Sequence, residues 1–135
     1  MNVKRFFDTN VLIYAFATDD PRNELAEDLV AEGGTVSIQV LSEFVNVSRH
    51  KLGRAWSEIR DELSVMKTLL DAPIPMTAEV HGGAVDIAER YGFHFYDSLI
   101  VAAALQAKCS ILYTEDFQHG QKIEGLTIRN PFSVT

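Results

Sequence analysis

Four acidic residues interrupt apolar sequence at well-separated points of the chain. They are Asp8 after Phe6-Phe7, Glu43 before Phe44-Val45, Asp97 before Ser98-Leu99-Ile100, and Asp116 before Phe117. Each is expected to lie near a hydrophobic core, where an unpaired charge is costly. Two carboxylates about 4 Å apart repel by roughly 4 kcal/mol at an effective dielectric constant near ~20, so converging acids need a cation. Because all the ligands are oxygens, Mg²⁺ or Mn²⁺ is the expected ion.

A site of this kind could hydrolyse a phosphodiester. A hard cation held by one or two carboxylates keeps several waters, which leaves positions for a phosphate oxygen and an attacking hydroxide. We expect Asp8 and Asp97 to be the primary metal ligands. Asp116 would help to complete the site directly or through water, and Glu43 would orient or deprotonate the nucleophile. The residue types leave these roles interchangeable, and they leave Glu115 as a rival to Asp116.

Each acid also has a purely structural interpretation. Asp8 could cap the helix that follows it, and Asp97 could be the N-cap of another helix. Asp116 could be a turn residue after a strand, and Glu43 could face solvent from one side of a helix. Capping and metal ligation are compatible, so a cap alone does not exclude the site.

Length and hydropathy set the expected class of protein. A chain of 135 residues is expected to form one domain, residues 1–135, that buries roughly two thirds of the surface of its unfolded form. The longest apolar runs, Val11–Ala17 and Leu99–Leu105, are far shorter than the ~20 residues that cross a bilayer. We therefore expect no membrane segment. Asp8 interrupts any apolar region of a signal peptide, so a cytoplasmic location is expected.

The charge balance restricts the mode of nucleic-acid binding. Twelve basic and nineteen acidic residues give a net charge of −7, which argues against nonspecific binding through Lys and Arg. A bound divalent ion would offset part of this charge, so a phosphodiester substrate is not excluded. The only cysteine, Cys109, cannot form an internal disulfide, and we expect it to be a small residue that leads into a strand. Without a cysteine pair, zinc is not expected.

Short β-type runs alternate with helical patterns, and these elements must position the acids. The expected strands are Val3–Phe7, Thr35–Ile38, Ser110–Thr114 and Leu126–Arg129, with a brief extended piece at Pro73–Met76. The expected helices are Val11–Phe16, a segment from the Asp19-Asp20-Pro21 cap to Gly33, Gln39–Leu52, Trp56–Leu70, Thr77–Tyr91 and Asp97–Gln106. This alternation predicts a three-layer α/β/α domain with a mainly parallel, four- to five-stranded central sheet. Ligands of such sheets bind beyond the carboxyl ends of the strands, where Asp8 and Asp116 fall.

Other candidate features carry less weight. The densest basic cluster comprises Arg49, His50, Lys51 and Arg54. It could contact RNA phosphates, although a solvated helix end is the simpler interpretation. His94, between two phenylalanines, is expected to be a partly buried packing residue, and His119 beside Gly120 a loop residue.

Four sequence strings carry a resemblance to a known family. They are Phe7-Asp8-Thr9-Asn10-Val11-Leu12-Ile13-Tyr14, Ser42-Glu43-Phe44-Val45-Asn46-Val47, Tyr96-Asp97-Ser98-Leu99-Ile100-Val101-Ala102-Ala103-Ala104 and Leu112-Tyr113-Thr114-Glu115-Asp116-Phe117. In this order and at this spacing they resemble the PIN-domain ribonucleases, specifically the VapC-type toxins of type II toxin–antitoxin modules. The resemblance covers the whole chain, and the ending Gly125–Phe132 is similar to the last strand of many such toxins.

The resemblance implies an endoribonuclease that depends on Mg²⁺ or Mn²⁺ and hydrolyses RNA with metal-activated water. It places Asp8, Glu43, Asp97 and Asp116 at the acidic metal-site positions and so prefers Asp116 over Glu115. It adds Asn10 and Thr114 as supporting polar residues. It also implies a small antitoxin protein as partner, a homodimer, and contact with DNA only through the antitoxin.

Two alternatives from other functional classes remain open. Asp8 could be a covalent phosphate acceptor in a phosphoryl-transfer module, although Asn10 stands where a phosphatase usually has a second aspartate. The chain could also be a noncatalytic interaction protein whose acids form a binding surface.

Overall fold

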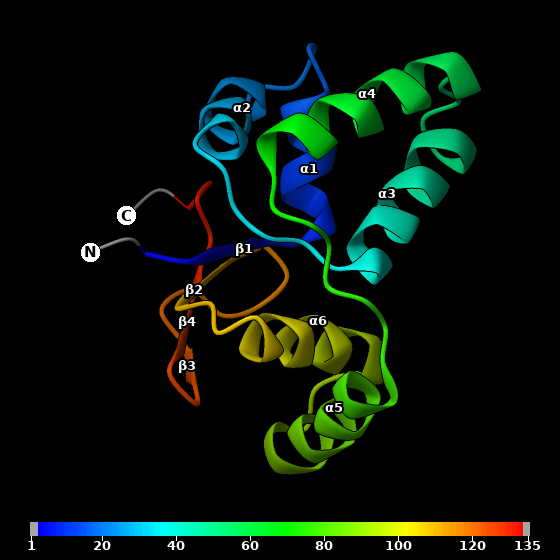
Figure 1. Ribbon diagram of the computed structural model, residues 1–135. Coiled ribbons are helices and arrows are strands. Elements are labelled where there is room, and N and C mark those ends of the chain that lie inside the picture. Colours follow the sequence, from blue (N-terminus) through cyan, green and yellow to red (C-terminus); the bar gives the residue numbers. More distant parts are fainter. Residues whose placement is uncertain (1–2, 134–135) are drawn as a thin grey trace.

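A small sheet separates two groups of helices. The computed structural model describes residues 3–133, with elements in the order β1 (Arg5–Phe7), α1 (Thr9–Ala15), α2 (Asn23–Ala31), α3 (Ile38–His50), α4 (Trp56–Leu69), α5 (Ala78–Tyr91), α6 (Phe95–Gln106), β2 (Ile111–Tyr113), β3 (Lys122–Ile123) and β4 (Leu126–Arg129). Helices α1 to α4 lie on one side of the sheet, and α5 and α6 lie on the other (Figure 1). This is the predicted three-layer α/β/α arrangement.

The sheet is mainly parallel, as predicted. Its strand order is β1-β2-β4-β3, with parallel pairing between β1 and β2 and between β2 and β4, and an antiparallel hairpin of β3 with β4. Phe6, Leu112 and Ile128 are paired across the three parallel strands and are fully buried. Because β1 and β2 run in the same direction and in register, the residues that follow them meet at one edge of the sheet.

One strand prediction needs correction, and one strand was missed. Thr35–Ile38 forms only isolated bridges, from Thr35 to Phe6 and from Ser37 to Ile74. The segment borders β1 but cannot continue as a strand, because α3 begins at Ile38 and Ser37 caps it by accepting from Val40 N. Strand β3 was not predicted, because two residues are too short to show an alternating pattern.

Three helix starts differ from the predictions by two residues. Helix α2 begins at Asn23, after Pro21, because Asp20 accepts hydrogen bonds from Arg22 instead of capping a helix. Helix α1 begins at Thr9 and is capped by Asp8, two residues before the predicted Val11.

Helix α6 begins at Phe95 and not at Asp97. Its N-cap is His94, whose Nδ1 accepts a 3.3 Å hydrogen bond from Tyr96 N. His94 is therefore an exposed capping residue, and its predicted packing role was wrong. Asp97 is the third residue of the helix, one turn inside the positive end of the helix dipole.

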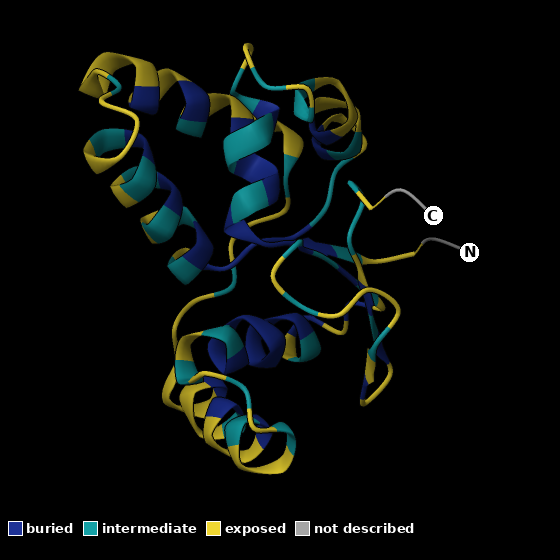
Figure 2. Ribbon diagram, turned by 180° about the vertical axis from the view of Figure 1, so that it is seen from behind, coloured by how far each residue is buried: buried dark blue, intermediate teal, exposed yellow. Residues whose placement is uncertain are grey.

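Helix α6 is the most deeply buried helix of the fold. All residues from Ser98 to Ala104 are buried, and Figure 2 shows this helix largely in the buried colour between α5 and the sheet. Cys109, just after α6, is also buried, and burial raises the pKa of its thiol to about 11. This agrees with the prediction of a small residue leading into a strand. Within residues 3–133, no helix is long and apolar enough to cross a membrane.

Two residues of the predicted basic cluster are engaged within the protein. Arg54 forms an ion pair with the buried Glu62 of α4, and Arg49 donates to Arg54 O while its guanidinium lies 5.2 Å from the centre of the Trp56 ring. These contacts favour a structural role at the connection between α3 and α4 over contact with RNA phosphates.

Candidate functional site

Asp8 lies where β1 passes into α1, and its carboxylate is held from two sides. Its Oδ1 accepts a 2.7 Å hydrogen bond from Thr9 N, and its Oδ2 accepts a 2.8 Å hydrogen bond from Thr114 Oγ1. The residue is only 4% exposed. The cap that sequence analysis considered as an alternative is therefore present, in a carboxylate that is also buried at the carboxyl edge of the sheet.

The environment of Asp8 disfavours its negative charge. The pKa of Asp8 is raised to about 7, chiefly by desolvation and in part by the nearby charges of Asp116 and Glu43, although the hydrogen bonds from Thr114 and Thr9 lower it. A buried acid with this pKa is neutral in about half of the molecules at neutral pH. Such a perturbed group is typical of functional sites.

Thr114 and Asn10 connect Asp8 with Asp116. The fully buried Thr114 hydroxyl donates to Asp8 and accepts from Asn10 Nδ2 at 3.4 Å and from Asp116 N at 3.0 Å. Asn10 Nδ2 also donates to Asp116 Oδ2 at 3.1 Å. The two predicted supporting residues thus lie between two of the predicted acids.

Asp116 and its rival Glu115 point to different partners. Asp116 is exposed as a residue, but partial desolvation of its carboxyl group raises its pKa, as do the charges of Glu115 and Glu43, while the hydrogen bond from Asn10 lowers it. Glu115 instead accepts hydrogen bonds from Tyr14 Oη and from Arg22 at 3.4 Å. Only Asp116 is turned to Asn10 and Thr114.

Glu43 reaches the same region from α3. Its Oε2 accepts a 2.7 Å hydrogen bond from Thr9 Oγ1, and its Oε1 accepts a 3.0 Å hydrogen bond from Gln39 Nε2. Gln39 also donates to Tyr96 O at 3.1 Å, which joins α3 to the start of α6. Glu43 is half-buried, so the solvent-facing alternative for this residue does not hold.

Asp97 approaches from the start of α6. Desolvation raises its pKa, and the charges of Asp116 and Glu43 raise it further, while His94 lowers it. Helix α6 therefore brings the last predicted acid within electrostatic range of two others.

Two residues that were not predicted, Thr9 and Gln39, hold Glu43 in place. Thr9 directly follows the predicted Asp8, and Gln39 precedes Glu43 by one helical turn on the same face. These spacings were the available signals. The contact between Thr9 and Glu43 itself joins residues 34 positions apart and depends on how α1 packs on α3.

The four acids lie near one another but do not form a complete metal-binding site. Within residues 3–133, no three histidine, cysteine, aspartate or glutamate side chains lie close enough together to hold a metal ion as they stand. The same part of the chain also contains no ion pair from lysine or arginine to Asp8, Glu43, Asp97 or Asp116. A cation would thus neutralise uncompensated charge, and it would have to draw the carboxylates together.

The donor chemistry fits a hard divalent ion. All four side chains offer carboxylate oxygens, the ligands that Mg²⁺ and Mn²⁺ prefer. In addition, Asn10 Oδ1 is buried beside them and accepts no hydrogen bond within the described residues. A buried acceptor without a donor is costly, and a cation or its water would satisfy it.

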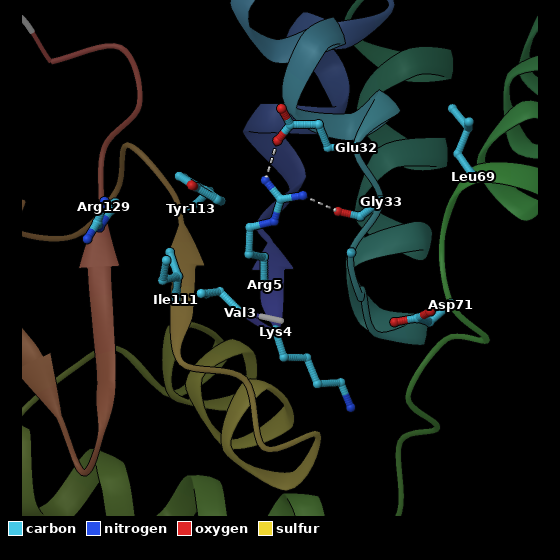
Figure 3. A pocket seen from close by; sticks show the side chains of 11 residues that line it. Val3, Lys4, Arg5, Glu32, Gly33, Leu69, Asp71, Ile111, Tyr113 and Arg129 are labelled. Atoms are coloured by element: carbon cyan, nitrogen blue, oxygen red, sulfur yellow. Dashed lines mark hydrogen bonds and ion pairs between the residues drawn. The ribbon is translucent and has the colours of Figure 1, made fainter. Parts of the chain in front are cut away.

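A groove opens beside the acids. Its volume is about 330 Å³, and it is lined by Thr9, Asn10, Ile13, Tyr14, Glu43, Asn46, Val47 and Asp116. A larger cavity of about 1040 Å³ lies against the sheet, and Figure 3 shows its lining residues. None of the four acids lines it, and its Arg5 already donates to Glu32 and to Gly33 O. The smaller groove is therefore the one that belongs to the acidic site.

The chain is similar to proteins of one family and one fold. Residues 5–122 match the family model of the PIN domain. No curated protein sequence matches the chain significantly.

Several solved structures of similar fold are described as proteins of toxin–antitoxin systems. A toxin–antitoxin complex from Klebsiella pneumoniae is 19% identical over 97% of this chain and 100% of that one, with a TM-score of 0.73. VapC20 of Mycobacterium tuberculosis, a toxin that cleaves the sarcin–ricin loop, is 19% identical over 84% of this chain and 90% of that one, with a TM-score of 0.69. VapBC2 of Rickettsia felis, bound to a promoter DNA fragment, is 18% identical over 94% and 98%, with a TM-score of 0.64. At these identities the likeness is one of fold.

Proposed function

The chain belongs to the PIN-domain family, and on that basis we propose that it is an endoribonuclease that hydrolyses RNA phosphodiester bonds with Mg²⁺ or Mn²⁺. The observation that carries this proposal is the buried Asp8 carboxylate, joined through Thr114 and Asn10 to Asp116 at the carboxyl ends of β1 and β2. Its charge has no lysine or arginine partner in the described chain, which favours compensation by a metal ion.

We assign Asp8 and Asp97 as the primary ligands. Thr9 N and Thr114 fix the orientation of the Asp8 carboxylate, and each of its oxygens keeps a second lone pair for a cation. Asp97 lies in the first turn of α6, where the helix dipole favours the ionised form. Asp116 completes the set directly or through water, guided by Asn10.

We propose that Glu43 orients and deprotonates the water that attacks the phosphate. A bound Mg²⁺ or Mn²⁺ would lower the pKa of a water and stabilise negative charge on the phosphate. Thr9 and Gln39 hold the Glu43 carboxylate beside the groove, where it can orient that water and accept its proton. The water oxygen bonds to phosphorus while the bond to the ribose 3′ oxygen breaks, and that oxygen takes up a proton from solvent. The products therefore carry a 5′-phosphate and a 3′-hydroxyl.

The cellular role that we propose is that of a toxin. The structural relatives include a sarcin–ricin-loop-cleaving toxin and toxin–antitoxin complexes, one of them bound to promoter DNA. By analogy this chain would be restrained by a cognate antitoxin protein, would form a homodimer, and would contact DNA only through the antitoxin. We therefore propose a cytoplasmic location.

The phosphoryl-acceptor alternative receives less support from the geometry. A nucleophilic aspartate must expose an oxygen to the incoming phosphate. Asp8 is buried and both of its oxygens already accept hydrogen bonds, so a bulky phosphate has less room to reach them than a small cation does. Trapping of Asp8 with beryllium fluoride and Mg²⁺ would nevertheless favour this alternative over hydrolysis of RNA.

RNA cleavage by purified protein tests the proposal. Wild type and Asp8→Asn are incubated with total RNA in Mn²⁺, in Mg²⁺ and in EDTA, and the ends are mapped by sequencing. We expect metal-dependent cuts with 5′-phosphate ends for the wild type and none for the variant. Identical maps for the two proteins, or ends with a cyclic phosphate, would overturn the assignment.

A further inference from the structure

Three side chains form a cluster beside the acidic site. Tyr14 of α1 donates its hydroxyl to the Glu115 carboxylate, in the loop that follows β2. The guanidinium of Arg22 lies 3.7 Å from the centre of the Tyr14 ring and donates to the other Glu115 oxygen at 3.4 Å. The Tyr14–Arg22–Glu115 cluster thus joins α1, the segment before α2 and the loop that carries Asp116.

Arg22 is itself held in a fixed orientation. Asp20 accepts from Arg22 Nε at 2.9 Å and from Arg22 Nη2 at 2.8 Å, and its Oδ1 also accepts from the Arg22 backbone N at 2.8 Å. A two-pronged pairing of this kind restricts a guanidinium more than a single contact does. Asn23 anchors the same segment by donating to Tyr14 O and Ala15 O. The guanidinium of Arg22 that stacks on Tyr14 is therefore held in place by hydrogen bonds.

Helical spacing gives the cluster its relation to the acids. Asn10 and Tyr14 are one turn apart on α1, so they share a face of the helix. Asn10 donates to Asp116 at 3.1 Å, and Tyr14 donates to Glu115. One face of α1 thus holds two consecutive carboxylates of the loop, and both Tyr14 and Asp116 line the same groove.

We infer that Tyr14, Arg22 and Glu115 are positioning residues that hold Asp116 at the acidic site. The inference rests on the proposed metal-dependent function. Asp116 is exposed, and its own side chain accepts only from Asn10 among the described residues. The neighbouring contacts of Glu115 restrict the backbone that carries Asp116, which reduces the freedom that a cation would otherwise have to remove. Phe117, whose ring packs edge-on against Phe93, anchors the other side of Asp116.

The substitutions Tyr14→Phe and Glu115→Ala test the inference. Tyr14→Phe removes only the hydroxyl, and Glu115→Ala removes the acceptor for both partners. Glu115→Gln keeps one acceptor oxygen and should fall between Glu115→Ala and the wild type. The matched control is Glu124→Gln, which breaks the surface ion pair with Arg90 at 3.5 Å; Glu124 lines a different cavity, which shares no residue with the groove.

Two measurements are made on each full-length protein. Calorimetry gives the Mn²⁺ dissociation constant, and hydrogen exchange reports the amides of residues 115–118. We expect Tyr14→Phe and Glu115→Ala to weaken Mn²⁺ binding roughly tenfold or more, in the range found when residues behind a metal ligand are changed. Exchange in 115–118 should accelerate, while Glu124→Gln behaves as the wild type in both measurements.

The outcomes separate this inference from the proposed function. If the wild type binds Mn²⁺ and Tyr14→Phe and Glu115→Ala bind it equally well, the positioning role is overturned. The nuclease proposal then remains intact. Absence of Mn²⁺ binding by the wild type overturns the proposed function. In that case unchanged exchange in 115–118 still rejects the cluster as a restraint on Asp116, and accelerated exchange retains it as a restraint without a metal role.

Discussion

Thr114 Oγ1 donates a 2.8 Å hydrogen bond to Asp8 Oδ2 across the ends of two parallel strands. The two residues are 106 positions apart in sequence, and both are buried. The pairing of β1 with β2 extends to this point, because Asp8 N donates to Tyr113 O. A hydroxyl and a carboxylate are thus fixed together by backbone geometry, and the acidic site depends on that contact.

Thr114→Val should destabilise the protein. Valine keeps the shape and branching of threonine but removes the hydroxyl that serves Asp8, Asn10 and the Asp116 amide. Loss of a buried donor to a carboxylate should lower the free energy of unfolding by about 1–3 kcal/mol. Urea unfolding measures this difference. The control is Thr127→Val, at a half-exposed position of β4. Equal losses of unfolding free energy in the two variants would contradict the prediction.

Asp8 should make the metal-free protein less stable as pH rises. Its pKa is about 7 in the folded protein against an ordinary value of 3.8, so between these values the folded state holds a proton that the unfolded state has released. Stability from Asp8 is complete below about pH 4 and is lost as pH rises to about 7. Three pKa units correspond to a change on the order of 4 kcal/mol at most.

Comparison with Asp8→Asn isolates this contribution from the other titrating groups. Asparagine also caps helices, so the variant keeps the bond from Thr9 N. In EDTA, the melting temperature of Asp8→Asn should exceed that of the wild type increasingly as pH rises from about 4 to about 7. A constant difference across this range would show that Asp8 titrates normally.

Local patterns predicted the site better than they predicted its contacts. Asp8 and Asp116 follow apolar strand runs, and that position alone predicted that both would lie at the carboxyl edge of a parallel sheet. The bond from Thr9 to Glu43 depends instead on the packing of α1 against α3, which no local pattern encodes. The different orientations of Glu115 and Asp116 have the same origin. They are set by Tyr14 and Asn10, which lie on a helix that is distant in sequence.

The element boundaries failed where side chains compete for the backbone. The β-branched residues Thr35 and Val36 favoured a strand, but Ser37 accepts from Val40 N and starts α3. Asp97 is a residue type that is common at helix N-caps, but His94 caps α6 three residues earlier. In each case one hydrogen bond decided between two conformations that the sequence allowed.

Arg54→Met should destabilise the protein more at high pH than at low pH. Arg54 pairs with the buried Glu62, and burial raises the pKa of Glu62 while Arg54 lowers it. Removing the guanidinium leaves the Glu62 carboxylate without its cation. The cost should be about 1–3 kcal/mol, less than for a fully buried pair, because Arg54 is partly exposed. Protonation of Glu62 relieves this cost, so the deficit should shrink as pH falls. Urea unfolding at about pH 8 and about pH 5 measures it.

The control for Arg54→Met is Arg60→Met on the exposed side of α4. This substitution removes the same charge and adds the same apolar side chain without uncovering Glu62. Its effect should stay within about 0.5 kcal/mol, as expected for a surface position. Equal effects of the two substitutions would show that the pair with Glu62 contributes nothing specific.

Mn²⁺ binding should release a proton when the pH is below the pKa of Asp8. That pKa is about 7, so at lower pH the ion must displace a proton before Asp8 can serve as a ligand. At about pH 6 we expect close to one proton per ion, and at about pH 8.5 close to none. The affinity should rise about tenfold per pH unit below about 7 and then level off. Calorimetry in two buffers of different ionisation enthalpy counts the protons. A Mn²⁺ affinity that stays constant over this range would remove Asp8 from the ligand set.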